Sequence, residues 1–229
     1  MTAIFNHDHI DFLVTTWLSG WRLMRGLPEP VPVEGGLRVE FGQPHRTYEF
    51  IALNADSSPV GVRRLCHLAS ETTGMNWLTI TTHSADATEV TVREAGLELA
   101  GPCETLMTCD FDTRPGHDLP EGYRLTTSTG EGVVRATIFS PTDEVAASGQ
   151  MAVLPQERTA VPDKIETSPA RRRRGLGSRL MAALTEEASK QGVTRGLLVA
   201  SPEGKLLYES LGWTTVASVL VARTPLLRE

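Results

Sequence analysis

The sequence predicts an α/β protein with a mixed, mostly antiparallel sheet flanked by helices, built as two related halves. Short apolar strand segments alternate with amphipathic helical segments along the 229 residues, which is typical of a sheet covered by helices. The order strand, helix, strand over residues 77–109 is repeated over residues 196–223, and such an internal echo predicts two imperfect copies of one unit. A segment rich in Pro, Gly and Asp, residues 112–122, is the expected linker between the halves.

The first half is expected to open with an amphipathic helix over residues 7–26, because apolar residues recur there at helical spacing before Gly26 and a run of prolines. The further elements expected in this half are strands at 37–41 and 48–53, a helix within 61–71, a strand at 77–82, a helix at 87–96 and one long strand at 97–109.

The second half is expected to begin with strands at 122–127, 131–140 and 144–154, followed by a strand that runs to Ile165. A helix should start near Gly175 and end before Gly192, and a strand should follow at 195–201. Ser201 is a good N-cap with a proline behind it, so a further helix is expected up to Gly212 and a last strand at 213–223.

Composition limits the classes of function. Hydrophobic residues make up 40 % and charged residues 22 % of the chain, which is an ordinary globular balance. The net charge of −6 argues against broad nucleic-acid binding. No apolar stretch approaches the ~20 residues of a membrane span, and the first residues, MTAIFNHDHIDF, do not have the pattern of a secretion signal. We therefore expect no membrane or nucleic-acid partner.

The cysteines and histidines predict neither a disulfide framework nor a metal site. Cys66, Cys103 and Cys109 are odd in number and have no CxxC spacing, which fits buried thiols in a reducing cytoplasm. His7 and His9 flank an aspartate and could contribute to a metal site, but no partner cluster follows them. The expectation is a cytoplasmic protein without a bound metal.

The stretch SPARRRRGLGSRLM, residues 168–181, indicates an anion site. The first N–H groups of a helix have no internal partners, and the helix dipole adds positive charge at the same place. Gly175 and Gly177 would let a phosphate approach the backbone, and the arginines would add cations. The GxxxxGK[ST] loop is absent, and the GxGxxG pattern fails at Leu180. The alternatives are a solvated arginine cluster beside an ordinary helix, or a docking patch for nucleic acid or a partner.

Three features in order make the second half similar to the Gcn5-related N-acetyltransferase (GNAT) superfamily. The family signature R/Q-x-x-G-x-G/A is present from Arg172 to Gly177, and the strand before it, KIETSP, stands where the family holds the pantetheine arm. Downstream, Tyr-x-x-x-Gly-aromatic is present from Tyr208 to Trp213. The resemblance implies the GNAT fold, with an intact copy at residues 123–229 and a degenerate copy at residues 1–111.

The resemblance also implies a co-substrate, acetyl-CoA or a related acyl-CoA. Its pantetheine arm would pair with the backbone of Ile165 and Thr167, in a gap beside the strand 196–201. Ser201 stands where relatives often carry an asparagine that makes a helper contact. The pyrophosphate would lie on the backbone N–H groups of Arg172, Arg173, Arg174, Gly175, Leu176, Gly177 and Ser178.

The same resemblance implies catalytic roles. The N–H of Ile165 would polarise the thioester carbonyl, and Tyr208 would be the acid that protonates the thiolate. Relatives often carry the general base at the position of Val161, which cannot serve. Asp163, two residues later and on the same face of the strand, is our candidate base. A water chain or a residue of the first half is the alternative.

We therefore expect an N-acetyltransferase that moves an acetyl group from acetyl-CoA to a primary amine of a small molecule, by direct attack in a ternary complex. The alternatives are an acetyltransferase of protein amines and a non-catalytic sensor of acyl-CoA. Val92 stands where a first-half tyrosine would be, so one cofactor site per chain is expected. Residues 123–172 lack the two helices usual in the family, so we expect the helix with Trp17 and Trp21 to wall the acceptor pocket. A homodimer is compatible with the sequence.

Overall fold

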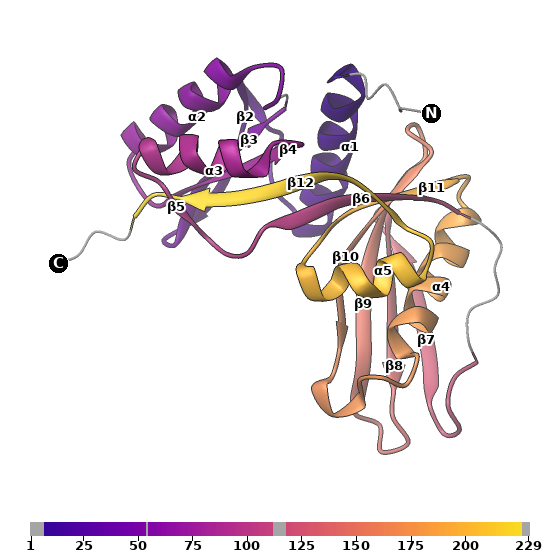
Figure 1. The fold of residues 1–229 in the computed structure, drawn as a ribbon. Helices are drawn as coiled ribbons and strands as arrows, with labels where there is room; N and C mark the ends of the chain where they lie inside the picture. Colours follow the sequence, from indigo (N-terminus) through magenta and orange to yellow (C-terminus); the bar gives the residue numbers. More distant parts are fainter. Residues whose placement is uncertain (1–6, 54, 112–117, 226–229) are drawn as a thin grey trace.

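The computed structural model describes residues 7–53, 55–111 and 118–225 and contains one sheet of twelve strands flanked by helices (Figure 1). The helices are α1 (His7–Arg25), α2 (Pro59–Glu71), α3 (Ala85–Glu94), the short 3₁₀ helix η1 (Pro169–Arg171), α4 (Leu176–Ser189) and α5 (Pro202–Ser210). The strands are β1 (Val31–Val33), β2 (Gly36–Gln43), β3 (Arg46–Ala52), β4 (Asn76–Thr82), β5 (Glu98–Leu99), β6 (Glu104–Asp110), β7 (Arg124–Gly130), β8 (Val133–Phe139), β9 (Val145–Leu154), β10 (Thr159–Thr167), β11 (Arg195–Ala200) and β12 (Thr214–Arg223).

Local sequence patterns predicted the α-helices and, with two exceptions, the strands, but not the short η1. The single strand expected over 97–109 is wrong: the segment is broken into β5 and β6, because Gly101 and Pro102 lie between them and proline cannot donate to a strand ladder. The short strand β1 was not predicted, since its VPV sequence lies in a proline-rich segment. Of the expected linker, residues 112–117 lie outside the described residues.

The order of strands in the sheet is symmetric about its centre. The path runs β1-β2-β3-β4-β12-β6-β11-β10-β9-β8-β7, and β5 pairs with β12 beside it. The parallel pair β3 and β4 on one side corresponds to the parallel pair β10 and β11 on the other. Each half contributes its last strand to the other half: β12 lies between β4 and β6, while β6 lies between β12 and β11. The two lobes in Figure 1 are therefore joined by two exchanged strands.

Helices cover both faces of this sheet. On one face, α4 and α5 pack on the strands of the second half, and α2 and α3 pack on those of the first half. On the other face, α1 lies across the centre of the sheet and contacts β9, β10 and β11. Strand residues alternate between these layers, so that Leu197 packs with α1 whereas Leu198 packs with α4. The N-terminal helix thus covers strands of the second half.

Close contact between α1 and β10 depends on Gly20. A Cβ atom on this residue would lie 2.6 Å from Cβ and Cγ2 of Val161, which is closer than atoms in a folded protein can approach. The absence of a side chain at Gly20 therefore sets how closely the helix packs on the strand.

We predict that Gly20→Leu lowers the free energy of unfolding by about 1–3 kcal/mol, because the side chain must push α1 away from β10. Gly101→Leu is the control, since no atom lies within 4 Å of a Cβ placed there. Urea unfolding followed by circular dichroism measures both changes. Equal stability of the two variants would contradict this account of the α1 contact.

Candidate functional site

The parallel strands β10 and β11 diverge after two paired positions. Thr159 pairs with Arg195 and Ala160 with Gly196, and no later pair joins these strands. The equivalent strands β3 and β4 instead stay paired from Tyr48 and Asn76 to Ala52 and Ile80. In the second half, the backbone groups at the carboxyl ends of both strands are thus free of each other, and such edges can pair with an extended ligand.

A β-bulge lies on the edge of this divergence. The register between β9 and β10 shifts between Asp163 and Glu166, so Lys164 and Ile165 together oppose one residue, Gly149. Lys164 has φ +53°, a left-handed conformation that is rare for a residue other than glycine. A bulge leaves its extra residue out of the strand ladder and re-aims the backbone. The backbone around Ile165 is therefore turned away from regular pairing with β9.

The start of α4 follows β10 and is open to an anion. Gly175 is the N-cap residue, with φ +74°, and no side chain caps this end of the helix. The first N–H groups of the helix, those of Leu176, Gly177 and Ser178, consequently lack the capping partner that a Ser or Asp would supply. Together with the helix dipole, they form a site suited to phosphate oxygens.

The corresponding helix start in the first half is closed. Ser58 caps α2 by accepting a hydrogen bond from the Gly61 N–H at 3.2 Å, and Pro59 has no N–H to offer. The turn before β2 packs directly on this end, since a Cβ on Gly35 would lie 2.5 Å from the Gly61 carbonyl oxygen. In the first half, the strands equivalent to β10 and β11 therefore do not diverge, and the helix equivalent to α4 has no open start.

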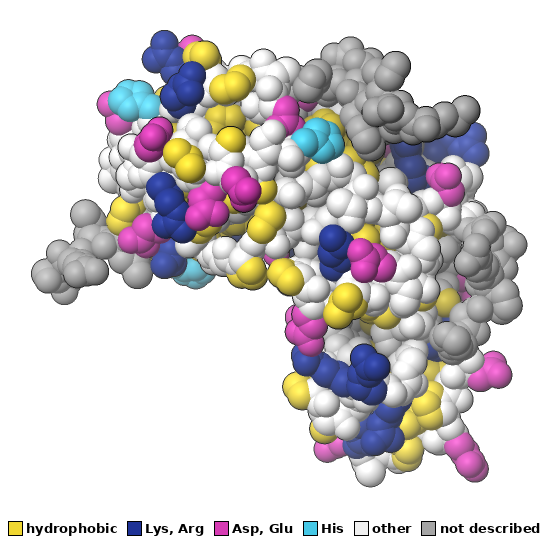
Figure 2. All heavy atoms as spheres, in the orientation of Figure 1, with side chains coloured by type: hydrophobic (Ala, Val, Ile, Leu, Met, Phe, Trp, Pro, Cys, Tyr) yellow, Lys and Arg dark blue, Asp and Glu magenta, His cyan; other side chains and the backbone are white. Residues whose placement is uncertain are grey.

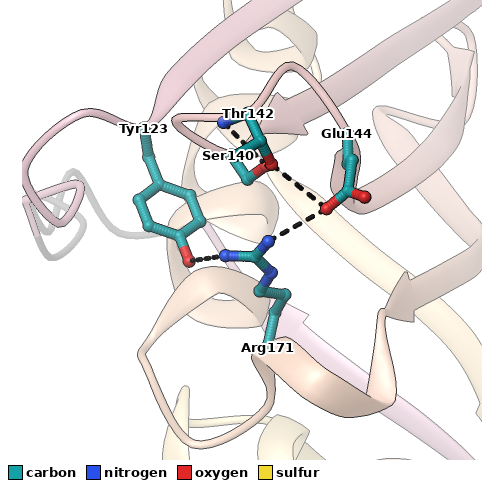
Figure 3. A network of polar contacts seen from close by, with 5 residues as sticks. All are labelled: Tyr123, Ser140, Thr142, Glu144 and Arg171. Carbon is teal, nitrogen blue, oxygen red and sulfur yellow. Dashed lines mark hydrogen bonds and ion pairs between the residues drawn. The ribbon is translucent and has the colours of Figure 1, made fainter.

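The four consecutive arginines have different partners, which sequence reasoning missed by treating them as one cluster. Arg171 donates to the Tyr123 hydroxyl at 3.3 Å and to Glu144 at 3.0 Å, and Thr142 also donates to Glu144 (Figure 3). The hydrogen bond to Tyr123, followed by that to Glu144, raises the pKa of Arg171. Arg171 thus ties η1 to the strands beside it.

The other three arginines leave room for a ligand. Arg172 donates to Glu203 at 2.7 Å, which links the loop before α4 to the first turn of α5 across exposed side chains. Arg173 and Arg174 are exposed and form no ion pair with any residue in the described ranges. An exposed ion pair such as that of Arg172 is worth at most about 1 kcal/mol, so a phosphate can compete for this guanidinium.

Tyr208 lies on α5 with its ring packed in the core of the second half. Its side chain is 8 % exposed, and the ring centroid lies 5.7 Å from that of Trp213. Burial, and to a lesser extent the negative charge of Asp163, raise the pKa of Tyr208 to about 12. The phenol therefore keeps its proton at neutral pH, and the charge of Asp163 acts on it in the same direction as burial.

Asp163 is held by an arginine from the first half. Arg25, the last residue of α1, donates to the two carboxylate oxygens at 2.5 and 3.3 Å, and Gln150 donates at 3.4 Å. The Arg25 guanidinium also lies 4.6 Å from the ring centroid of Trp21. A carboxylate that takes a proton loses such an ion pair, which argues against Asp163 as the base. An arginine in the last turn of an amphipathic helix is ordinary, so the sequence held no signal for this role.

A second polar cluster lies on the same face of the sheet as α1. Glu49 of β3 is fully buried and accepts hydrogen bonds from Arg46 Nε at 2.7 Å and Thr79 Oγ1 at 2.5 Å. Burial raises the pKa of Glu49 although Arg46, Thr79 and Arg25 lower it.

The Arg46 guanidinium packs over the rings of Phe41, Trp77 and Trp21. Because Arg25 acts on both Glu49 and Asp163, this cluster adjoins the site at β10.

The remaining sequence-predicted residues have local roles. Val161 is buried beneath Gly20, and Val92 is buried in the core of the first half. The Ser201 side chain accepts a hydrogen bond from the Gly204 N–H at 3.1 Å, which confirms it as the N-cap of α5. In the described ranges, no group of His, Cys, Asp and Glu side chains could hold a metal ion. No helix of those ranges is long and apolar enough to cross a membrane.

We predict that Arg25→Met lowers the free energy of unfolding by about 1.5–3 kcal/mol, because Asp163 is left largely buried without its charged donor. Arg124→Met is the matched control: it breaks an exposed ion pair with Asp143 and should change stability by less than about 1 kcal/mol. Urea unfolding at neutral pH measures both. A loss from Arg25→Met no larger than that of the control would show that the ion pair does not anchor α1.

Comparison with known proteins identifies this architecture. Residues 129–215 match the acetyltransferase (GNAT) domain family. No curated protein matches the chain. A GCN5-related N-acetyltransferase from Kribbella flavida has a TM-score of 0.69 at 13 % identity, over 94 % of this chain and 95 % of that one.

Two further solved structures share the fold. A tandem GNAT protein from the clavulanic acid biosynthesis pathway has a TM-score of 0.56 at 12 % identity, over 77 % of this chain and 74 % of that one. A GNAT-family acetyltransferase described as putative, from Novosphingobium aromaticivorans, has a TM-score of 0.55 at 16 % identity, over 92 % and 95 %. Residues 129–215 of the second half are thus similar to the acetyltransferase (GNAT) domain family, and the chain shares its fold with these solved structures.

Proposed function

We propose that this chain is an N-acetyltransferase that moves an acetyl group from acetyl-CoA to a primary amine of a small molecule, by direct attack in a ternary complex. The observation that carries the proposal is the divergence of β10 and β11, which leads to an uncapped α4 at one end and to Tyr208 beside it. In the first half, by contrast, the equivalent strands β3 and β4 stay paired, and Ser58 caps the start of α2.

The residues present fit acetyl-CoA. Two exposed cations, Arg173 and Arg174, stand before a helix whose first N–H groups have no side-chain cap, and this suits a diphosphate. The divergent edge of β10, with Ile165 and Thr167, suits an extended pantetheine arm that pairs through main-chain groups. When bound, acetyl-CoA supplies an acetyl group activated as a thioester. Ser201 is engaged as a helix cap, so its side chain has little left to offer the cofactor.

The protein's own groups have separable tasks in this proposal. The Tyr208 hydroxyl holds a proton at neutral pH and donates it to the departing sulfur. The N–H of Ile165, displaced by the bulge, donates a hydrogen bond to the thioester carbonyl oxygen. Asp163, paired with Arg25, fixes the end of α1 against β10, and its negative charge adds to the effect of burial in raising the pKa of Tyr208.

The first half supports the site without binding a cofactor. We propose that residues 1–111 are a degenerate GNAT copy, that 112–122 link the halves and that 123–229 bind the acyl-CoA. The symmetric strand order supports this assignment, and the capped start of α2 supports a single cofactor site per chain. Because α1 covers β10 and β11 on the face away from α4, the acceptor must approach past the end of α1. This restricted approach favours a small amine over a protein surface.

We predict that Tyr208→Phe lowers turnover about 10²-fold or more while the dissociation constant for CoA stays within about twofold, because the ring packing is kept and only the proton is lost. Thiol release over a panel of primary amines measures turnover, and calorimetry measures binding. Unchanged turnover would remove Tyr208 from the mechanism. Binding of acetyl-CoA without thiol release by the wild type would instead favour a sensor.

We predict that Gly177→Val weakens CoA binding at least about tenfold, because its Cβ would lie 3.1 Å from Leu207 Cδ2 and 3.7 Å from Thr167 Oγ1, so the side chain would displace the start of α4 on which the diphosphate is proposed to lie. Gly101→Val, in an exposed turn with no atom within 4 Å of a Cβ, is the control and should bind CoA as the wild type does. Calorimetric titration with CoA measures both affinities, and thermal unfolding verifies that both variants are folded. Equal affinities would place the diphosphate elsewhere.

A further inference from the structure

We propose that Glu104 of β6 holds the ammonium group of the acceptor and takes its proton, so that the general base of the second half comes from the first half. This inference rests on the proposed function. Four observations carry it: the position of Glu104 along the sheet, the face on which its side chain lies, the ion pairs of the other carboxylates on that face, and the charges around Glu104.

The exchanged strand brings Glu104 to the open end of the site. β6 pairs with β11, and its residue Thr105 lies opposite Ala200, the last residue of β11. The chain then passes through Ser201 into α5, which carries Tyr208. Glu104 is one residue beyond Thr105, so it lies level with the end of β11, and only that strand separates it from the divergence of β10 and β11.

The Glu104 side chain lies on the face of the sheet that α1 covers. Leu106, two residues along the same regular strand, packs in the cluster beneath α1, and side chains alternate between the faces of a strand. Asp163 is two residues from Val161, which packs in the same cluster, so it shares this face. This is the face opposite α4 and α5, where an acceptor can meet a thioester held between the diverging strands.

The other carboxylates of this face are already engaged. Glu49 accepts hydrogen bonds from Arg46 and Thr79, and Asp163 accepts them from Arg25. The Glu104 side chain is half-buried and has no hydrogen bond or ion pair with any residue in the described part of the chain. Among the three, Glu104 alone therefore has both oxygens free to bind a cation and accept a proton.

The charges around Glu104 favour its role as a base for an ammonium group. Burial, and then the negative charge of Glu49, raise the pKa of Glu104, whereas the positive charge of Arg46 lowers it. Arg25 at the end of α1 and Arg223 at the end of β12, the strand whose Val219 lies opposite Glu104, are further charged groups on this face. Arg195, Asp110 and Arg135 also lie on it, by the alternation of side chains along β11, β6 and β8. A carboxylate that is partly removed from water gains a counter-ion from an ammonium group and accepts its proton more readily than an exposed one.

The proton balance is complete with the groups named. The acceptor ammonium gives one proton to a Glu104 oxygen, and the neutral amine forms the new C–N bond while the C–S bond to CoA breaks. The sulfur takes the Tyr208 proton, and the second proton of the reacting nitrogen restores the Tyr208 hydroxyl. The products are the N-acetyl amine, CoA thiol and protonated Glu104, which releases its proton to water.

The test compares Glu104→Gln with Glu40→Gln, a control on β2 whose side chain is exposed. At neutral pH we expect Glu104→Gln to lower kcat/KM about 10²- to 10⁴-fold, with unchanged CoA affinity. The loss should shrink as pH rises, because a free amine then needs no base. In the wild type, kcat/KM should rise with pH through the pKa of Glu104, and this limb should disappear in Glu104→Gln. Glu40→Gln should match the wild type.

A readout without turnover accompanies the kinetics. Carbon-13 NMR of the free protein, with the Glu104 carboxyl assigned by its loss in Glu104→Gln, should show a midpoint above 4.5, the ordinary value for a glutamate. A midpoint at or below this value would overturn the proposal. So would a wild-type pH profile in Glu104→Gln, or a limb that disappears in Asp163→Asn instead. A wild type that binds CoA but acetylates no amine would overturn both this role and the proposed function.

Discussion

The exchange of β6 and β12 between the halves is the constraint on which the rest of this structure depends. These two strands pair with each other from Thr214 and Thr108 to Val219 and Glu104, and each is bordered on its other side by a strand of the opposite half. Backbone hydrogen bonds therefore continue from one lobe into the other without an edge between them (Figure 1). Neither half can move or unfold alone without breaking the ladders of both, so the two form one cooperative unit.

This continuity allows the role that we propose for the first half, which is to support the second half without binding a cofactor. In the first half, the strands stay paired, Ser58 caps the helix and the turn at Gly35 packs against the first turn of α2. A filled and fully paired lobe is a rigid base for the other, whose diverging strands and uncapped helix lack such contacts. The concave corner between the lobes in Figure 2 follows from this division, because the exchanged strands join the lobes at an angle. The acceptor side then depends on residues of both halves.

Local patterns predicted the parts of the site that depend on neighbours in sequence. The cap formed by Ser201 and Pro202, the break at Gly192 and the open start of α4 each depend on a few adjacent residues. Contacts between distant residues could not be predicted this way. Arg25 and Asp163 are 138 positions apart, and nothing in the VREAGLELAGPCETLM stretch marks Glu104 as a neighbour of β11. Glu49 has the spacing of a surface residue on an alternating strand, and only the placement of α1 and Arg46 buries it.

The electrostatics of the junction separate an acid from a base. Proton transfer in both directions at neutral pH requires one group that keeps its proton and another that is ready to accept one. Burial and the negative charge of Asp163 raise the pKa of Tyr208 to about 12, far above neutrality, so the phenol keeps its proton. Burial and the negative charge of Glu49 raise the pKa of Glu104, which makes its carboxylate readier to accept a proton. In each case burial is the largest cause, and a neighbouring carboxylate that is held by an arginine acts in the same direction: Asp163 is held by Arg25, and Glu49 by Arg46. Two similar ion pairs, one on each side of the exchanged strands, thus act on the two groups for which we propose opposite roles.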